Sequence, residues 1–232
     1  MQLHNNFAQR VVVLSAQQQW QPSPMAGVCR MMLDRAGGEV ARATSLVRYA
    51  PGSGYHSHRH EGGEEILVLE GVFSDEHGDY PAGTYLRNPP GSSHTPYSKD
   101  GCLLLVKLWQ FSAGDAQQLV LHSHQTDFVP GIAPGLSVLP LHEFDGVSTA
   151  LVRFAPHTRF HPHIHPGGEE ILVLEGVFCD ELGAYPAMSW LRNPRYSQHQ
   201  PFTCEEGALI YVKVGHLGAA LLGDKFIQSA VE

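Results

Sequence analysis

Short apolar segments recur along the whole chain, and polar and turn-forming residues separate them. They are rich in Val, Ile, Leu and Tyr, and the clearest in the first half are residues 11–14, 44–50, 64–73, 84–88 and 103–109. Gly, Pro and Asp clusters such as residues 51–54 and 89–91 lie between them. No window has the periodicity of an amphipathic helix, so the segments are predicted to be strands. Regularly spaced short strands are typical of an all-β sandwich or closed barrel.

The same pattern of segments occurs twice in the chain. The string GGEEILVLEGVF occurs at residues 62–73 and again at residues 167–178. Weaker similarity extends on both sides, so that the copies cover about residues 10–111 and 118–217. Such self-similarity indicates one structural unit used twice. We therefore expect two β domains, residues 1–113 and residues 114–232, joined at a polar stretch.

Composition and charge exclude some functions. The hydrophobic fraction of 43% and charged fraction of 16% are those of a globular protein. A formal net charge of −8, without a cluster of Lys or Arg, predicts no binding to nucleic acid. The N-terminus has no pattern of a secretion signal, and no apolar stretch is long enough to span a membrane.

The four cysteines, Cys29, Cys102, Cys179 and Cys204, are far apart and form no C-x-x-C pair. The spacing predicts neither a zinc knuckle nor a dithiol redox motif. Reduced thiols in a cytoplasmic protein are the simplest interpretation, and a redox-sensing thiol is the alternative.

Histidines precede each copy of the repeated string. His58 and His60 are two residues apart on a predicted strand, so their side chains face the same side. Imidazoles at that spacing can bind one ion with metal–nitrogen distances of about 2.0–2.1 Å. Glu64 follows, and His94 comes from a later strand behind the turn PPGSS. These four residues are the predicted metal ligands of the first copy.

A pair of histidines on one strand face could also serve packing or hydrogen bonding. The full set recurs, however, as His163, His165, Glu169 and His199. Retention of all four side chains amid changed neighbours favours a second metal site.

Several neighbours of these ligands have more than one interpretation. His56 and His161 could be a fifth ligand, an acid or base, or hydrogen-bonding partners of the ligands. Glu65 and Glu170 point away from the ligand face if the strand is regular, and would support the ligands or face solvent. Arg87 and Arg192 are expected in an interior polar network or turn, with substrate recognition as the alternative.

The motifs carry a family resemblance. Residues 52–71 read G-x5-H-x-H-x3-E-x6-G and residues 83–94 read G-x5-P-x-G-x2-H. Together they resemble the two motifs of the cupin superfamily. The resemblance implies two tandem jelly-roll-like β-barrels, each with a metal near its mouth, held by His58, His60, Glu64 and His94 and by their counterparts in the second copy.

More narrowly, HxHxGGEExLVLxGxF followed by DExGxYPxGxxxRNP resembles the cupin domain of ChrR anti-sigma factors. The helical H-x3-C-x2-C zinc segment of those proteins has no counterpart here. Three motif glycines, Gly52, Gly83 and Gly91, are replaced in the second copy by His157, Met188 and Tyr196. We therefore expect the second site to be drier and more closed than the first.

The resemblance implies a metal-binding sensor or regulator in the response to singlet oxygen or hydroperoxides. A sigma factor or other regulator is then a partner, zinc is the expected metal with up to two ions per chain, and a homodimer is expected. Iron, manganese and nickel remain alternatives. The other hypothesis is a metal-dependent dioxygenase that cleaves a small diketone, with Glu64 as fourth ligand or base. A third is that only the first site is active, while the second stabilises the fold.

Overall fold

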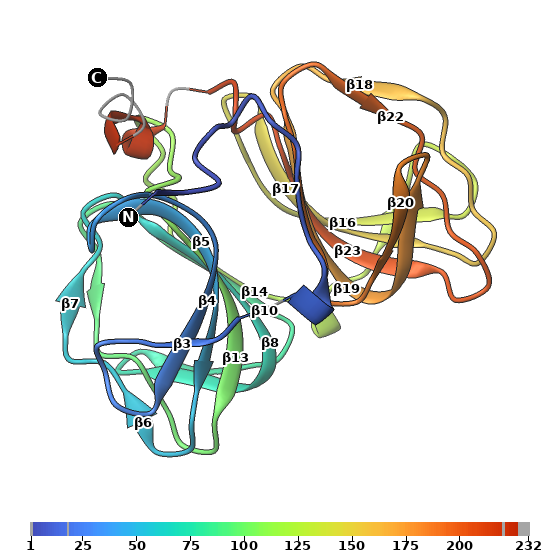
Figure 1. Cartoon of the computed structure of the whole chain (residues 1–232). Coiled ribbons are helices and arrows are strands. Elements are labelled where there is room, and N and C mark those ends of the chain that lie inside the picture. The colour runs from blue at the N-terminus through green and yellow to red at the C-terminus, as the bar shows by residue number, and fades with distance from the viewer. Residues whose placement is uncertain (1, 18, 220, 227–232) are drawn as a thin grey trace. The chain divides into compact units, whose positions relative to one another are not determined.

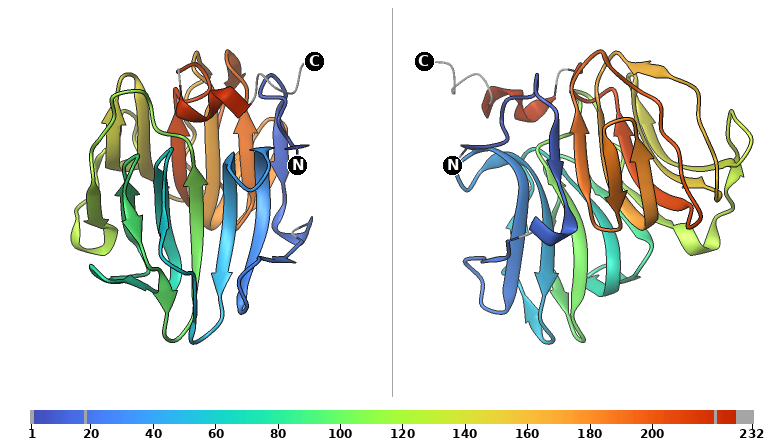
Figure 2. Two further views of the ribbon diagram at one scale, coloured as in Figure 1. Left: turned by 90° about the vertical axis from the view of Figure 1, so that its left-hand side faces the viewer. Right: turned by 45° about the vertical axis from the view of Figure 1, so that its right-hand side comes forward.

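The computed structural model describes residues 2–17, 19–219 and 221–226, and these residues fold as antiparallel strands with three short 3₁₀ helices (Figure 1). The prediction of an all-β protein is confirmed. The chain divides into two compact units. Unit 1 comprises residues 1–5, 19–125 and 220–232, and unit 2 comprises residues 6–18 and 126–219. Figure 2 shows the curved sheets from two further sides.

The elements of unit 1 are β1 (Gln2–Leu3), β3 (Gln21–Pro22), β4 (Val28–Gly37), β5 (Ala41–Tyr49), β6 (Ser53–Gly54), β7 (His58–Arg59), β8 (Glu64–Asp75), β9 (Gly78–Pro81), β10 (Thr84–Asn88), β11 (Ser93–His94), β12 (Tyr97–Ser98), β13 (Cys102–Leu108), β14 (Leu119–His122), and the 3₁₀ helices η2 (Ser123–Gln125) and η3 (Leu222–Phe226). The order along its main sheet is β1-β4-β5-β13-β8-β10-β14, and β7 pairs separately with β11.

The elements of unit 2 are β2 (Val11–Val13), η1 (Ser15–Gln17), β15 (Val129–Pro130), β16 (Leu136–Phe144), β17 (Val147–Phe154), β18 (His163–His165), β19 (Glu169–Asp180), β20 (Gly183–Pro186), β21 (Trp190–Asn193), β22 (Ser197–His199) and β23 (Ala208–Val214). The order along its sheet is β15-β16-β17-β23-β19-β21-β2, and β18 pairs with β22. From β16 to β2 this order repeats the order from β4 to β14 in unit 1, and β15 beside β16 corresponds to β3 beside β4.

The repeated string forms an interior strand of each main sheet. β8 pairs with β13 and β10, and β19 pairs with β23 and β21. Alternate side chains of these strands face the interior, where Ile66, Val68 and Phe73 are at most 1% exposed. These side chains belong to the apolar cluster of unit 1, and their counterparts Ile171, Val173 and Phe178 belong to that of unit 2.

One of the two edge strands of each main sheet comes from the other copy of the sequence repeat. β2, from the start of the first copy, pairs with β21 of unit 2, so that Val12 lies opposite Leu191. β14, from the start of the second copy, pairs with β10 of unit 1, so that Val120 lies opposite Leu86. In Figure 1 the dark blue N-terminal segment accordingly runs beside the orange strands. The expected division at residues 113 and 114 follows the sequence repeat, whereas the compact units exchange these segments.

Among the described residues, no helix has the length and hydrophobicity needed to cross a membrane. The four cysteines form no disulfide; Cys102 and Cys179 are buried and Cys204 is exposed. Burial raises the pKa of Cys102 to about 11, so that this thiol is protonated at neutral pH.

Candidate metal centres

Two short strands bring the three histidines of unit 1 together. His58 on β7 lies opposite His94 on β11, and the backbone N–H of His60 donates to Ser92 O. One ring nitrogen from each of the three histidines lies within 4.8 Å of the others. The Nε2 atoms of His60 and His94 are 3.0 Å apart. The rings of His58 and His60 thus lie in one cluster, although the regular strand β7 ends at Arg59.

Glu64, the first residue of β8, completes the group. Its Oε2 atom is 3.3 Å from His60 Nε2 and 3.5 Å from His94 Nε2. The side-chain amide of Asn88 donates to the same oxygen at 3.2 Å. Asn88 lies beside Glu64 because β10 pairs with β8 in that register. The structure thus brings together all four side chains that were predicted as ligands of the first copy.

Hydrogen bonds fix which ring nitrogens face the centre. His58 Nδ1 lies 2.9 Å from the carbonyl oxygen of His56, and His94 Nδ1 lies 3.2 Å from Asp75 Oδ2. Both partners can only accept, so the Nδ1 atoms carry the protons and the Nε2 lone pairs remain for a metal. His56 contributes its carbonyl here, and its side chain is exposed. Asp75 was missed from the sequence, although its recurrence as Asp180 is a signal that could have found it.

The residues present fit a divalent ion. With metal–ligand bonds of about 2.1 Å, neighbouring ligand atoms lie roughly 3.0–3.4 Å apart, which matches the spacings among His60, Glu64 and His94. Burial lowers the pKa of His60, which outweighs the raising effect of Glu64. Its imidazole is therefore neutral, as a metal ligand must be.

Unit 2 repeats this arrangement. His163 on β18 lies opposite His199 on β22, and the Nε2 atoms of His165 and His199 are 3.0 Å apart. Glu169 lies 3.5 Å from each of these two rings, and Asn193 donates to it at 2.9 Å. Burial lowers the pKa of His165 to about 3. The protein therefore has two His₃ metal-binding sites.

The support around the second site differs from that around the first. Arg10 lies just before β2, and its guanidinium donates to Asn193 Oδ1 and Asp180 Oδ2, both at 2.9 Å. Asp180 Oδ2 lies 3.8 Å from His199 Nδ1. Arg10 in the N-terminal segment thus keeps Asn193 and Asp180 in place, and these two residues contact Glu169 and His199 of the second site. Sequence analysis missed Arg10, since the aligned residue of the other copy is Gln118.

The glutamates that follow the ligands are buried in both units. Glu65 accepts from Tyr85 and forms an ion pair with Arg87 at 3.2 Å, and Arg87 also contacts Asp115. Glu170 accepts from Trp190 at 2.8 Å and lies 3.2 Å from His216. The interpretation of Arg87 as part of an interior polar network is confirmed.

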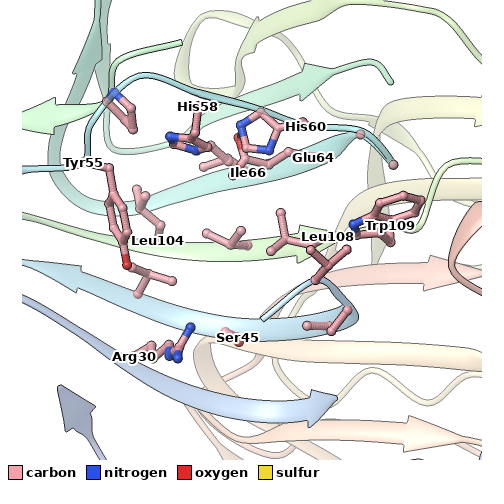
Figure 3. Close-up of a pocket in the computed structure, with 18 of the residues that line it drawn as sticks. Arg30, Ser45, Tyr55, His58, His60, Glu64, Ile66, Leu104, Leu108 and Trp109 are labelled. Carbon is pink, nitrogen blue, oxygen red and sulfur yellow. Dashed lines mark ion pairs between the residues drawn. The ribbon is translucent and has the colours of Figure 1, made fainter. Parts of the chain in front are cut away.

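A cavity of about 370 Å³ opens beside the histidines of unit 1 (Figure 3). His58, His60, Glu64 and His94 line one side, and apolar side chains such as Leu104 line the walls. Trp109 also lines it, with a φ of 61°, where unit 2 has Gly215. A Cβ atom on Gly62 would lie 2.0 Å from the Trp109 ring, so only glycine fits there. The expectation that the second site is more closed stays a prediction.

Comparison with known families decides the classification. A family model described as the ChrR cupin-like domain matches residues 8–112 and again residues 116–218. The chain belongs to this family. It is a bicupin with two tandem ChrR cupin-like domains, and the predictions of cupin motifs and of two barrels are confirmed. A comparison with curated proteins gives no match.

Solved bicupin-like structures share the fold at low sequence identity. A candidate dioxygenase from Nostoc punctiforme superposes with a TM-score of 0.73 at 18% identity, over 89% of this chain and 82% of that one. The pirin of Escherichia coli, solved with nickel(II), gives 0.65 at 12% identity, over 89% and 99% of the two chains. Oxalate decarboxylase of Bacillus subtilis, studied for its Mn(II) centres, gives 0.62 at 14% identity, over 95% and 83%.

Proposed function

We propose that this bicupin is a metal-dependent enzyme whose reaction takes place in unit 1, and that its reaction is the oxidative cleavage of a small diketone or related oxygenated compound by dioxygen. The observation that carries the proposal is the cavity of about 370 Å³ against His58, His60 and His94. Such a volume suits a small organic molecule, and mostly apolar walls with a few convergent polar groups are typical of substrate sites.

The residues of unit 1 would have separate roles in the proposed reaction. His58, His60, His94 and Glu64 would hold the ion, and Asp75 and Asn88 keep two of these side chains in place. A bound ion would polarise the carbonyl oxygens of a diketone and, as iron, activate dioxygen. Leu104 and Val106 give the cavity apolar walls that would contact the body of a substrate. As the alternative to its role as a ligand, Glu64 at the cavity wall would accept a proton from the carbon between two carbonyls.

The proposal favours particular metals. Zinc with four protein ligands is saturated when it is tetrahedral, whereas iron, manganese and nickel accept about six ligands and leave positions for a substrate. We therefore propose iron, manganese or nickel in unit 1, and zinc remains a candidate for a stabilising site in unit 2. Elemental analysis of protein purified without an affinity metal measures both identity and stoichiometry.

Oxygen uptake by iron-loaded protein tests the reaction. We expect a diketone-dependent signal that His60→Ala abolishes. The matched control is His165→Ala, which removes the aligned ligand in unit 2 and should leave the uptake largely intact. Uptake that is absent across a panel of diketones, or that is lost only in the unit 2 variant, would rule the proposal out.

A second candidate function is a sensor or regulator in the response to singlet oxygen or hydroperoxides. The match to the ChrR cupin-like domain favours it. In that function, oxidation or loss of the metal would alter a contact with a sigma factor or another regulator. Affinity capture of partners before and after oxidant treatment tests it, and a set of bound proteins that is the same in both states would exclude it.

A further inference from the structure

The interior of unit 1 contains cationic and hydroxyl groups that the metal site does not use. Arg30 lies on β4 opposite Val47 of β5, and Val28, two residues earlier, lies opposite Tyr49. Val28 and Tyr49 belong to the buried core, so Arg30 shares the strand face that lines the interior. Figure 3 shows Arg30 across the cavity from His58, His60 and Glu64, and Leu104 and Leu108 lie between.

Among the described residues, Arg30 forms one weak ion pair. Its guanidinium lies 3.5 Å from Glu39, whose side chain is 76% exposed. An ion pair of this kind contributes at most about 1 kcal/mol, so Arg30 can exchange Glu39 for a ligand inside the cavity. Arg35 lies nearby but is held differently, because its side chain donates to the backbone oxygens of Gly38 and Glu39. Arg59 also lines the cavity and pairs weakly with Glu61, but it directly follows His58 on β7, so Arg30 is the guanidinium that a ligand can engage on the side opposite the histidines.

The charges around the cavity leave a positive surplus once a divalent ion is bound. The ionisable side chains that line it, apart from the histidines, are Arg30, Arg35, Arg59, Glu39, Glu61 and Glu64. The three guanidinium and three carboxylate charges balance, so that the ion adds two positive charges. An anionic ligand would reduce this surplus in a mostly apolar cavity, where charges interact strongly.

Unit 2 lacks the same groups. The pairing of Arg30 with Val47 corresponds to the pairing of Val138 with Val152 in unit 2. The two phenols that line the first cavity, Tyr49 and Tyr55, align with Phe154 and Phe160. Both copies keep the metal ligands, so the guanidinium and the hydroxyls are not needed to build the barrel or to hold the ion.

We propose that the unit 1 ligand is an oxo acid, with oxygen donors at the metal end, a short apolar body, and a carboxylate that pairs with Arg30 at the opposite end. Figure 3 shows the Tyr55 hydroxyl on the Arg30 side of the cavity, where it can donate to the same carboxylate. Burial raises the pKa of Tyr49, which keeps this second hydroxyl protonated as a donor. The proposal specifies the substrate class of the function proposed above and rests on it.

Calorimetry of the metal-loaded protein under nitrogen tests the substrate class without turnover. The probes are a β-diketone with a carboxylate at the end of its chain and the same diketone with a methyl group in its place. We expect the carboxylate form to bind about tenfold more tightly or better, because a guanidinium–carboxylate pair is a strong, charge-assisted contact. Equal affinities, or no binding of either probe, would overturn the proposal.

Three variants test whether Arg30 causes the preference for the carboxylate probe. Arg30→Gln should reduce the preference to about twofold or less, and Arg30→Lys should restore part of it because it keeps the charge. Arg48→Gln is the matched control: Arg48 lies on β5 and its guanidinium stacks on Trp20, away from the cavity lining. Metal content and melting temperature are measured for each variant. A preference that survives in Arg30→Gln would overturn the proposal.

The two proposals fail in different ways. If the carboxylate preference depends on Arg30 but no probe supports oxygen uptake, the substrate class stands and the proposed reaction fails. If uptake is as fast with the uncharged diketone and is unchanged in Arg30→Gln, the reaction stands and the substrate class fails.

Discussion

Units 1 and 2 have nearly the same metal ligands, but the residues around those ligands differ. In unit 1, Arg30 and Tyr55 line a cavity on the histidines. In unit 2, valine and phenylalanine occupy the aligned positions, and Arg10 instead supports the site through Asn193 and Asp180. Because both units retain the same candidate ligands, the proposed difference between a reactive and a stabilising site rests on the groups that surround those ligands.

The largest expected effect comes from removing a ligand in unit 2. His165→Ala should lower the free energy of unfolding by about 3 kcal/mol when free metal is about a hundredfold above its Kd, because the ion binds only the folded state. Oxygen uptake by unit 1 should be unchanged. Thermal unfolding and metal analysis measure this. Equal melting temperatures of variant and parent would show that the second ion does not stabilise the fold.

A smaller effect is expected at the exchanged strands. Val12 packs against the core of unit 2, whereas the aligned Val120 on β14 is 46% exposed. Val12→Asp should destabilise unit 2 by about 2 kcal/mol because it buries a carboxylate, and Val120→Asp should have little effect. Hydrogen exchange measures each unit separately. Similar losses of protection in both variants would contradict the assignment of β2 to unit 2.

Arg10→Ala should weaken metal binding at the second site alone. Loss of a residue that holds ligand partners typically costs tenfold or more in metal affinity, so about a tenfold change is expected. Gln118→Ala is the matched control, since Gln118 aligns with Arg10. Competition with a chelator measures the affinities. If both variants release metal at the parent's chelator concentration, Arg10 has no role in the site.

The smallest effect concerns backbone conformation. Tyr196 has a φ of 61° where unit 1 has Gly91 with a φ of 91°. The left-handed conformation costs a residue with a side chain roughly 1 kcal/mol, so Tyr196→Gly should stabilise unit 2 by about that amount. Gly91→Ala should destabilise unit 1 similarly. Urea unfolding of the two variants should therefore shift in opposite directions.

Repetition explains what could be predicted from the sequence. His58 and Glu64 could be named as candidate ligands because their counterparts recur among changed neighbours, and the strands could be predicted because apolar segments alternate with turns. Asp75 recurs too, but its role depends on the distance to His94, which only the fold supplies. Arg30 could not be found in this way, because a search for retained residues overlooks a residue that one copy lacks.

The exchange of edge strands could not be predicted from the sequence, for a different reason. Similarity identified residues 10–20 and 118–128 as equivalent, but either segment could complete either sheet. Local hydrophobicity is the same in both arrangements, and the choice depends on how the connecting chain runs. The family match at residues 8–112 and 116–218 follows the repeat and contains no information about this choice.

The strand exchange has a consequence for synthesis on the ribosome. β2 emerges before every other strand of unit 2, yet its partner β21 ends at Asn193. At about 5–20 residues per second, β2 waits roughly ten to forty seconds for its partner. Unit 1 depends on β14 and can close its main sheet soon after residue 122 emerges. The main sheet of unit 1 would therefore be complete while β2 is still unpaired, with its three valines available to chaperones throughout the interval.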